Sequence, residues 1–222
     1  MAQETNRRIV KSVANGIPSW SREQEARQAG ARSIAGIDEA GRGPLAGPVV
    51  AAAVILPFGK DITNLNDSKL LTPRIREELF DIIMIRASSI GIGIVSPKQI
   101  DQINIYQATR LAMAIAIRKL SPAPDHLLID GPMSVDLPIE QRPIIKGDRL
   151  SCSIAAAAVM AKVTRDRIMM DLHQKYPEYG FASHKGYGTK AHKAAINQFG
   201  PSPVHRKCFR GVREHFQMSI FE

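Results

Sequence analysis

Cysteine is scarce in this chain of 222 residues, which has only Cys152 and Cys208 and no CxxC pair. A disulfide framework and a cysteine-based zinc site therefore have no support in the sequence, and a reduced, cytoplasmic compartment is expected. An HExxH motif is also absent. The two commonest signatures of zinc enzymes are thus both missing.

Long apolar runs are missing as well. The longest uncharged run, residues 44–59, is interrupted by Pro48 and Pro57 and is too short to cross a bilayer. Arg7, Arg8 and Lys11 near the N-terminus are not followed by the apolar stretch of a secretory signal. We therefore expect no association with a membrane.

Positive charge is abundant, with 30 Lys and Arg against 21 Asp and Glu, a net charge of +9 and a pI near 9.8. Residues 183–213 contain no acid, and aromatic residues are interleaved with the cations. This pattern favours a nucleic-acid partner over a basic tail that serves only solubility. The cations and histidines of this segment are Lys185, Lys190, Lys193, Arg206, Lys207, Arg210, Arg213, His184, His192 and His205.

Acids follow three short apolar stretches. Asp38 and Glu39 follow Ile34–Ile37, Asp130 follows residues 126–129, and Asp148 follows residues 143–147. With helices between them, these stretches indicate an α/β layer in which carboxylates converge at strand ends. Clustered carboxylates repel one another, and a divalent cation relieves the repulsion; oxygen ligands favour Mg²⁺ or Mn²⁺ over zinc.

The remaining elements follow from apolar periodicity and from capping residues. Strands are expected near 49–56 and 88–95, and helices near 73–86, 97–120, 151–175 and 190–199. We expect residues 1–32 to form an irregular arm, residues 33–180 a catalytic core, and residues 181–222 a basic substrate-binding segment packed on that core.

Several motifs, taken together and in order, resemble those of bacterial ribonuclease HII, the type 2 ribonuclease H. They are GIDEAGRGPLAGPVVAAAVIL, LNDSKLLTP, LLIDGP, KGD, SIAAAAVMAKVTRDR, YGFASHKGYGTKAH and PVHRKCF. The resemblance covers residues 33–213. It implies a ribonuclease H-like fold, with a central mixed sheet of five strands flanked by helices and a helical C-terminal segment. It also implies an endonuclease that cuts the RNA strand of RNA–DNA hybrids and the 5′ side of single ribonucleotides in duplex DNA.

The resemblance places four catalytic acids at Asp38, Glu39, Asp130 and Asp148. These acids would hold two Mg²⁺ or Mn²⁺ ions, with Asp38 as the bridging ligand, for hydrolysis that leaves a 3′-hydroxyl and a 5′-phosphate. Asp166 is the competing candidate for the fourth acid. Because two arginines flank it on a helix, a salt-bridge network is the preferred interpretation.

Substrate recognition is expected from a glycine loop, Gly41, Arg42 and Gly43, and from Tyr187. Glycines let the main chain approach the 2′-hydroxyl, and Tyr187 would stack on the adjoining deoxyribose. Lys69 is a candidate phosphate contact, with a plain surface lysine as the equal alternative. The spacing GxGxxxG and the strand that follows it exclude a dinucleotide loop, and no P-loop ending is present.

Two other functions were weighed. A non-catalytic hybrid-binding protein would not need the four acids, and another two-metal nuclease would not need Gly-Arg-Gly directly after Asp-Glu. Structural or phosphate-contacting roles are expected for His184, His192 and His205. A monomer that binds RNA–DNA hybrid and ribonucleotide-containing duplex DNA is the expected working form.

Overall fold

The computed structural model describes residues 17–68 and 71–217. A five-stranded sheet in the order β3-β2-β1-β4-β5 forms its centre. β2 runs antiparallel to β1 and β3, while β4 runs parallel to β1 and β5. The predicted mixed five-stranded sheet is therefore confirmed. The strands are β1 (Ile34–Ala40), β2 (Val49–Ile55), β3 (Ser89–Val95), β4 (His126–Asp130) and β5 (Glu140–Ile144).

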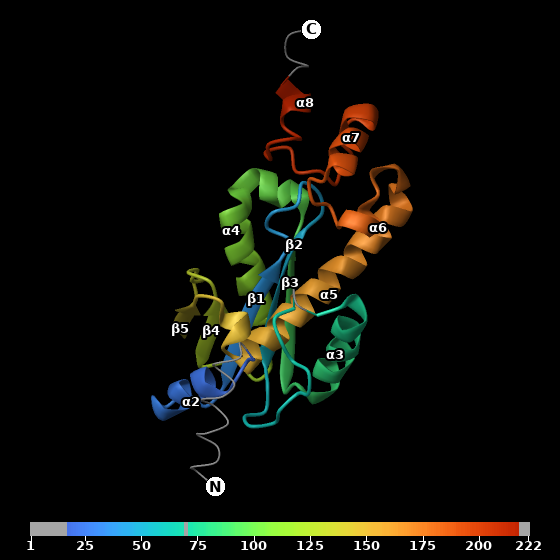
Figure 1. Ribbon diagram of the computed structural model, residues 1–222. Coiled ribbons are helices and arrows are strands. Elements are labelled where there is room, and N and C mark those ends of the chain that lie inside the picture. The colour runs from blue at the N-terminus through green and yellow to red at the C-terminus, as the bar shows by residue number, and fades with distance from the viewer. Residues whose placement is uncertain (1–16, 69–70, 218–222) are drawn as a thin grey trace.

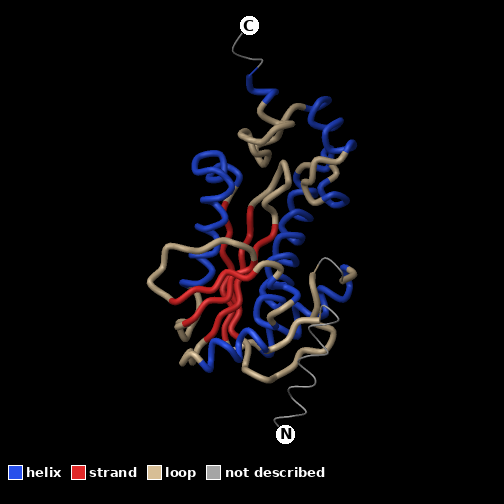
Figure 2. Tube along the Cα trace, turned by 60° about the vertical axis from the view of Figure 1, so that its left-hand side comes forward, coloured by secondary structure: helices blue, strands red, loops and turns tan. Residues whose placement is uncertain are grey.

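Helices cover both faces of the sheet, with α4 on one face and α5, backed by α3, on the other (Figures 1 and 2). β2 separates the two cores, since Ala51 and Ala53 face the α4 side whereas Ala52 and Val54 face the α5 side. The helices are α2 (Ser21–Gln28), α3 (Pro73–Arg86), α4 (Pro97–Arg118), α5 (Cys152–Lys175), α6 (Phe181–His184), α7 (Lys190–Phe199) and α8 (Glu214–Gln217), with 3₁₀ turns η1 (Gly147–Arg149) and η2 (Pro177–Tyr179).

Small residues set the close spacing between helix and strand. A Cβ added at Gly91 or Gly93 of β3 would lie 1.9 Å from a carbonyl oxygen of α4. At Gly36 of β1, a Cβ would lie 2.1 Å from the main chain of Ser153 in α5. These glycines and the buried alanines of α5 let both helices rest directly on the sheet.

The predicted helices begin where their caps are. Hydroxyls of Thr72, Ser96, Ser151 and Thr189 each accept a hydrogen bond from a main-chain N–H three residues later. The predicted ends at Arg86, Lys175 and Phe199 are confirmed, and α4 ends at Arg118, slightly before the predicted Leu120. The proline after each of the first two caps occupies the first turn, where its missing N–H costs nothing.

The expectation of an irregular N-terminal arm is wrong for residues 21–28, which form α2; residues 1–16 lie outside the described chain. The side chain of Glu23 is buried, and Oε1 accepts hydrogen bonds from Ser151 Oγ at 2.6 Å and from the Ser153 N–H at 2.9 Å. A buried carboxylate therefore fastens α2 to the start of α5. Burial raises the pKa of Glu23, against the opposing effect of the Ser151 and Ser153 hydrogen bonds.

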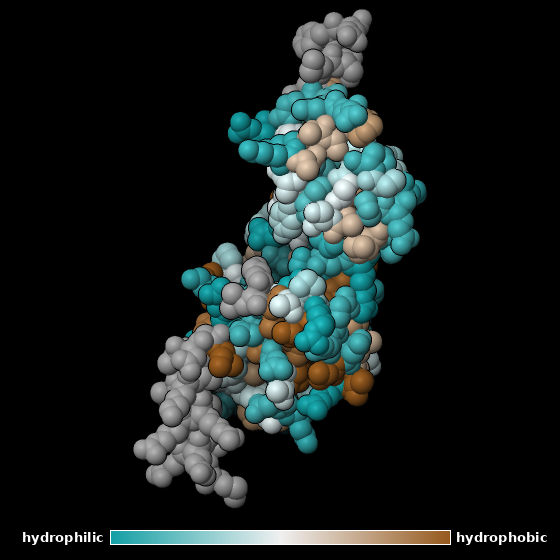
Figure 3. All heavy atoms as spheres, turned by 45° about the vertical axis from the view of Figure 1, so that its right-hand side comes forward, coloured by the Kyte–Doolittle hydropathy of each residue, from teal (hydrophilic) through white to brown (hydrophobic). Residues whose placement is uncertain are grey.

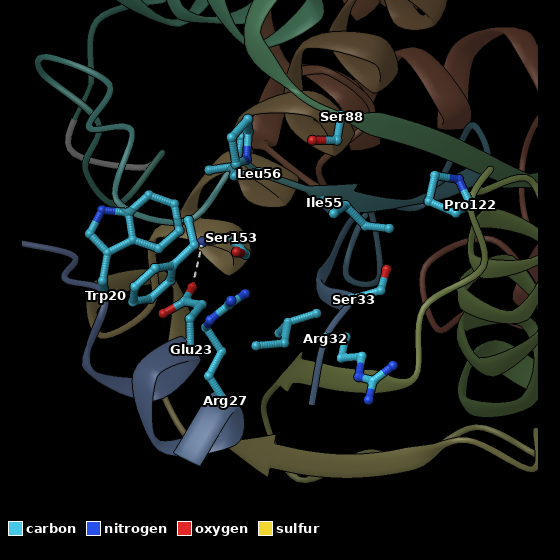
Figure 4. Close-up of a pocket in the computed structure, with 13 residues that line it drawn as sticks. Trp20, Glu23, Arg27, Arg32, Ser33, Ile55, Leu56, Ser88, Pro122 and Ser153 are labelled. Carbon is cyan, nitrogen blue, oxygen red and sulfur yellow. Dashed lines mark hydrogen bonds between the residues drawn. The ribbon is translucent and has the colours of Figure 1, made fainter. Parts of the chain in front are cut away.

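A cavity of about 270 Å³ lies beside this contact, between α2 and the strand ends farthest from Asp38 (Figure 4). Trp20, Arg27 and Ser33 are among the residues that line it. Within the described residues, Glu23 Oε2 and Ser33 Oγ lack a hydrogen-bond partner. Buried polar atoms beside a cavity large enough for water are ordinarily satisfied by ordered water.

The C-terminal segment packs above the β1–β2 connection. Its core joins Leu45 and Ala46 to Met169 of α5, Phe181 of α6 and Ile196 of α7. Figure 3 shows mainly hydrophilic residues on the visible face of this upper part of the molecule. None of the helices in the described part of the chain is long and apolar enough to cross a membrane.

Candidate active site

Asp38 and Asp130 lie side by side on neighbouring parallel strands. β1 and β4 pair Ile37 with Ile129, and the next residue of each strand is an acid. Glu39 follows Asp38 within β1 itself, which extends to Ala40. The predicted convergence of acids at the carboxyl ends of these strands is therefore present in the structure.

Asp148 reaches the same place through a tight turn. Lys146 has a left-handed conformation, with φ of 56°, and the 3₁₀ turn η1 follows it. The Gly147 N–H donates to Asp130 Oδ1 at 2.6 Å. A Cβ on Gly147 would lie 2.6 Å from Ile154 Cδ1 and 3.3 Å from that same carboxylate oxygen. Glycine at 147 thus lets the turn close against Asp130 and place the buried Asp148 nearby.

The pKa of Asp38 responds to the charges of the other three acids, so the four acids form one cluster. Burial, followed by the charges of Glu39 and Asp130 and then that of Asp148, raises the pKa of Asp38 well above its usual range. The Glu39 N–H donates to Asp38 Oδ1 at 2.7 Å and opposes this shift. Asp38 is only 7% exposed, so water screens the repulsion poorly.

The donor set of this cluster fits a hard divalent cation, because it consists of carboxylate oxygens whose negative charges repel one another. Within residues 17–68 and 71–217, no three acid, His or Cys side chains already surround a single point as metal ligands would. Asp38 and Asp130 instead accept hydrogen bonds from main-chain N–H groups.

Asp166 is separate from this cluster. It lies on α5 and pairs with Lys162, whose Nζ is 2.8 Å from Asp166 Oδ1. The expected salt-bridge role of Asp166 is thus present, with Lys162 as the partner, whereas Arg167 pairs with Glu77 and Arg165 donates to a main-chain carbonyl inside the protein. An i,i+4 ion pair with lysine accounts for Asp166.

The glycine loop connects β1 to β2 directly after the acids. Gly41 is buried with φ of 96°, whereas Arg42 and Gly43 are exposed. A Cβ on Gly43 would lie 3.7 Å from Cε1 of Tyr187, whose side chain is 48% exposed on the loop between α6 and α7. Arg42 Nη1 is 3.4 Å from Glu39 Oε1. The predicted sugar-reading residues therefore adjoin one another and the acids.

Two buried arginines, Arg165 and Arg206, hold this loop, and no local sequence pattern predicted either role. Arg206 donates to the carbonyls of Gly41 at 2.6 Å and of Arg42 and Gly47 at 3.0 Å. Burial and the nearby Arg165 lower the pKa of Arg206 to about 9. The expectation that Arg206 belongs to a nucleic-acid surface is wrong, because its side chain is fully buried and its donors are used by the loop.

Arg165 holds the other end of the loop. Its guanidinium donates to the carbonyls of Pro48 at 3.0 Å, Ala46 at 3.2 Å and Lys185 at 3.0 Å. A Cβ on Gly41 would lie 2.0 Å from Arg165 Nε, so glycine is required there for space as well as for its positive φ. The β1–β2 loop and the segment that carries Tyr187 are joined through this side chain.

Lys69 lies outside the described residues. The loop that precedes it is tied to the acid turn, because Arg149 donates to Asp67 Oδ2 at 2.8 and 3.0 Å. His192 and His205 are buried, so a phosphate-contacting role is wrong for these two and the structural alternative holds.

The chain is similar in sequence to known proteins over most of its length. The model of the family described as Ribonuclease HII matches residues 35–218. The ribonuclease HII of Geobacter sulfurreducens is 59% identical over 196 residues, covering 88% of this chain and 90% of that protein.

Solved structures share the fold. Ribonuclease H2 from Pyrococcus horikoshii superposes with a TM-score of 0.72 at 26% identity, over 86% of this chain and all of that one. Bst ribonuclease HIII in complex with Mn²⁺ has a TM-score of 0.64 at 17% identity, over 89% of this chain and 73% of that one. The predicted ribonuclease H-like fold is confirmed. The chain belongs to the ribonuclease HII family, endoribonucleases that cleave RNA in RNA–DNA hybrids and at ribonucleotides embedded in DNA.

Proposed function

We propose that this ribonuclease HII cuts on the 5′ side of a single embedded ribonucleotide and leaves a 3′-hydroxyl and a 5′-phosphate. The observation that carries the proposal is the buried Asp38, whose pKa is raised by burial and by Glu39, Asp130 and Asp148, next to the loop of Gly41 and Gly43. The acids that would catalyse cleavage therefore adjoin the loop that would recognise the ribose.

Asp38, Glu39, Asp130 and Asp148 would hold the divalent ions, Mg²⁺ or Mn²⁺. The Mn²⁺ bound to Bst ribonuclease HIII supports this choice of metal. When bound, two such ions supply an activated water and stabilise the leaving oxygen of the phosphodiester. Two main-chain hydrogen bonds orient the carboxylates: the Glu39 N–H donates to Asp38 and the Gly147 N–H donates to Asp130.

Recognition of the ribonucleotide would use main-chain groups of residues 41–43 and the ring of Tyr187. The loop carbonyls of Gly41 and Arg42 are fixed by Arg206, so the loop is rigid before substrate arrives. The ring of Tyr187, half exposed beside Gly43, would stack on the deoxyribose next to the ribonucleotide. A second ribose there would bring a 2′-hydroxyl against the ring. Lys69 remains a predicted phosphate contact.

Cleavage and substrate binding would be divided between two parts of the chain. Residues 33–180 would form the catalytic core and residues 181–222 the substrate-binding segment, in a monomer that acts on RNA–DNA hybrid and on DNA containing ribonucleotides. Both cysteines, Cys152 and Cys208, are unpaired, in keeping with a cytoplasmic enzyme. Removal of ribonucleotides left in replicated DNA would be its role.

The test is cleavage of a labelled DNA duplex with one ribonucleotide, compared with a uniform RNA–DNA hybrid, in Mg²⁺ or Mn²⁺. Tyr187→Ala is expected to lower the ratio of kcat/KM on the single-ribonucleotide duplex to kcat/KM on the uniform hybrid at least about tenfold. Stacking on an aromatic ring is worth about 1–3 kcal/mol. Tyr187→Phe keeps the ring and is the matched control, with a ratio near that of the native enzyme. An unchanged ratio for Tyr187→Ala would remove Tyr187 from recognition.

A further inference from the structure

The main chain of Tyr187 is held from several sides. Its N–H donates to the His184 carbonyl at 2.9 Å, and its carbonyl accepts from the Thr189 N–H at 2.8 Å. The preceding residue is joined to the glycine loop, since the Leu45 N–H donates to the Gly186 carbonyl at 2.8 Å. The orientation of the exposed ring therefore depends on a backbone that is fixed from within the protein.

One of these restraints comes from a buried pair of histidines. His192 Nδ1 lies 2.9 Å from the carbonyl oxygen of Tyr187, and His192 Nε2 lies 3.0 Å from His205 Nε2. His192 is 0% exposed and His205 is 1% exposed. Phe181 packs edge-on against His192, with ring centroids 5.4 Å apart, and so seals the pair from water.

Only one arrangement of protons satisfies this chain of contacts. The Ser202 N–H can only donate, so His205 Nδ1, at 2.9 Å, must accept and the proton of neutral His205 lies on Nε2. The Ser202 hydroxyl, 2.8 Å from the same Nδ1, then also donates to it. That proton is donated to His192 Nε2, which leaves the proton of His192 on Nδ1. A carbonyl can only accept, so His192 Nδ1–H donates to Tyr187. Every ring nitrogen is used, and each has one role.

We propose that His192 and His205 form a neutral positioning pair that fixes the Tyr187 carbonyl and thereby orients the ring that distinguishes a single ribonucleotide from a continuous RNA strand. This rests on the proposed role of Tyr187 in recognition. Neither histidine is a catalytic residue, because both rings are fully buried behind the exposed loop. The pair acts on specificity through the backbone of residue 187.

A positive charge on either imidazole ring would disrupt this series of hydrogen bonds. A second proton on His205 would face the Ser202 N–H, and one on His192 would face His205 Nε2–H. Burial lowers the pKa of His192 to about 4, with His184 adding to the effect, and burial and His192 lower the pKa of His205 to about 4, with smaller effects of His184 and His215. His184, stacked 4.4 Å from His192, and Tyr179, whose ring is 4.8 Å from His205, are the titratable groups packed directly on the pair.

The proton arrangement can be tested without measuring activity. Two-bond ¹H–¹⁵N correlation spectra of the full chain at pH 7 are expected to show His192 as the neutral Nδ1–H tautomer and His205 as the neutral Nε2–H tautomer. The opposite tautomer of His192, or a charged ring in either residue, would overturn the proposal.

Two substitutions at His192 separate positioning from packing. His192→Asn places an amide donor near the position of Nδ1, whereas His192→Gln places its amide near the position of Nε2, where the oxygen can accept from His205 but no donor reaches the Tyr187 carbonyl. The readout is the ratio of kcat/KM on the single-ribonucleotide duplex to that on the uniform hybrid. We expect His192→Gln to lower this ratio about tenfold, corresponding to the loss of one buried hydrogen bond, and His192→Asn to keep it within about threefold of the native value.

The outcomes distinguish this proposal from the one on which it rests. If Tyr187→Ala lowers the ratio but His192→Gln, folded as judged by thermal unfolding, does not, the positioning pair is wrong and the role of Tyr187 stands. If Tyr187→Ala leaves the ratio unchanged, the recognition proposal itself fails. Equal loss of the ratio in His192→Asn and His192→Gln would reduce His192 to a packing residue and would also contradict the proposal.

Discussion

At the scale of single residues, the site depends on carboxylates that are placed at a cost to stability. Asp38 is buried among acids, and burial together with Glu39, Asp130 and Asp148 raises the pKa of its carboxyl. A folded state that retains a proton more strongly than the unfolded state loses stability as the pH rises through the folded pKa. Near neutral pH, in the absence of metal, Asp38 therefore destabilises the fold.

Asp38→Asn should consequently stabilise the metal-free protein while it abolishes cleavage. An increase of about 1–3 kcal/mol in the free energy of unfolding at pH 7 is expected, since each pKa unit is worth about 1.4 kcal/mol. Chemical denaturation with and without Mg²⁺ measures this free energy. Mg²⁺ should stabilise the unsubstituted protein but not Asp38→Asn. Asp136→Asn, at an exposed acid, is the control. A less stable Asp38→Asn protein would contradict this electrostatic account.

The choice of the fourth acid gives a second prediction at this scale. Asp148→Asn should lower kcat by at least about 100-fold, because it removes a negative charge from the metal-binding cluster. Asp166→Asn removes only the ion pair with Lys162 and should retain nearly native activity. Single-turnover cleavage of the one-ribonucleotide duplex compares the two. An active Asp148→Asn protein beside an inactive Asp166→Asn protein would reverse the assignment.

At the scale of elements, the buried carboxyl group of Glu23 is one of the contacts that attach α2 to α5. Burial raises the pKa of Glu23. For the exposed Glu25 on the same helix, burial also acts to raise the pKa, but the hydrogen bonds and charges of Arg142 and Arg22 together leave that pKa lowered. The two glutamates should therefore respond to pH in opposite directions.

Glu23→Gln tests this attachment. The contribution of Glu23 to stability is greatest below the unfolded pKa of about 4.5 and is lost as the pH rises through the folded value. The free energy of unfolding of Glu23→Gln, relative to the native protein, should therefore improve by about 1–2 kcal/mol between pH 4 and pH 8. Glu25→Gln is the matched control and should show the opposite trend. Parallel trends for the two variants would refute the attachment by a raised-pKa carboxyl.

At the scale of the whole molecule, the net charge of +9 is presented partly by exposed cations of the C-terminal segment, such as Lys190, Lys193, Lys207 and Arg210. A phosphate contact makes affinity fall with salt, at about 0.9 in logarithmic slope for each contact with duplex DNA. Contacts of this kind position the duplex and do not read the sugar.

Lys193→Ala should weaken binding of every duplex to a similar degree and reduce the salt slope by about one, with the cleavage ratio between single-ribonucleotide and hybrid substrates unchanged. Fluorescence anisotropy over a series of salt concentrations measures this. Lys60→Ala, in the loop after β2 at the end of the sheet away from the acids, should leave the slope unaltered. A change confined to one substrate would instead assign Lys193 to recognition.

The sequence was most informative where a local pattern determines structure, and least where a partner lies far along the chain. Alternating apolar residues and hydroxyl caps predicted the strands and the helices that begin at Pro73, Pro97 and Lys190, because these signals act within a few residues. α2 has little apolar periodicity and is held by Glu23, so no local signal revealed it. Arg206 resembled a surface cation, since its three carbonyl partners lie in the β1–β2 loop.

Arg165 and Arg206, which donate to the β1–β2 loop, lie late in the sequence and are therefore synthesised after the acids. The four acids and every strand precede residue 149, whereas the donors that hold the β1–β2 loop, Arg165 and Arg206, leave the ribosome later. A nascent chain that ends before Arg206 has all four carboxylates, but the carbonyls of Gly41, Arg42 and Gly47 lack the guanidinium that fixes them. The residues proposed for cleavage are thus translated before the arginine that holds the loop proposed for selectivity.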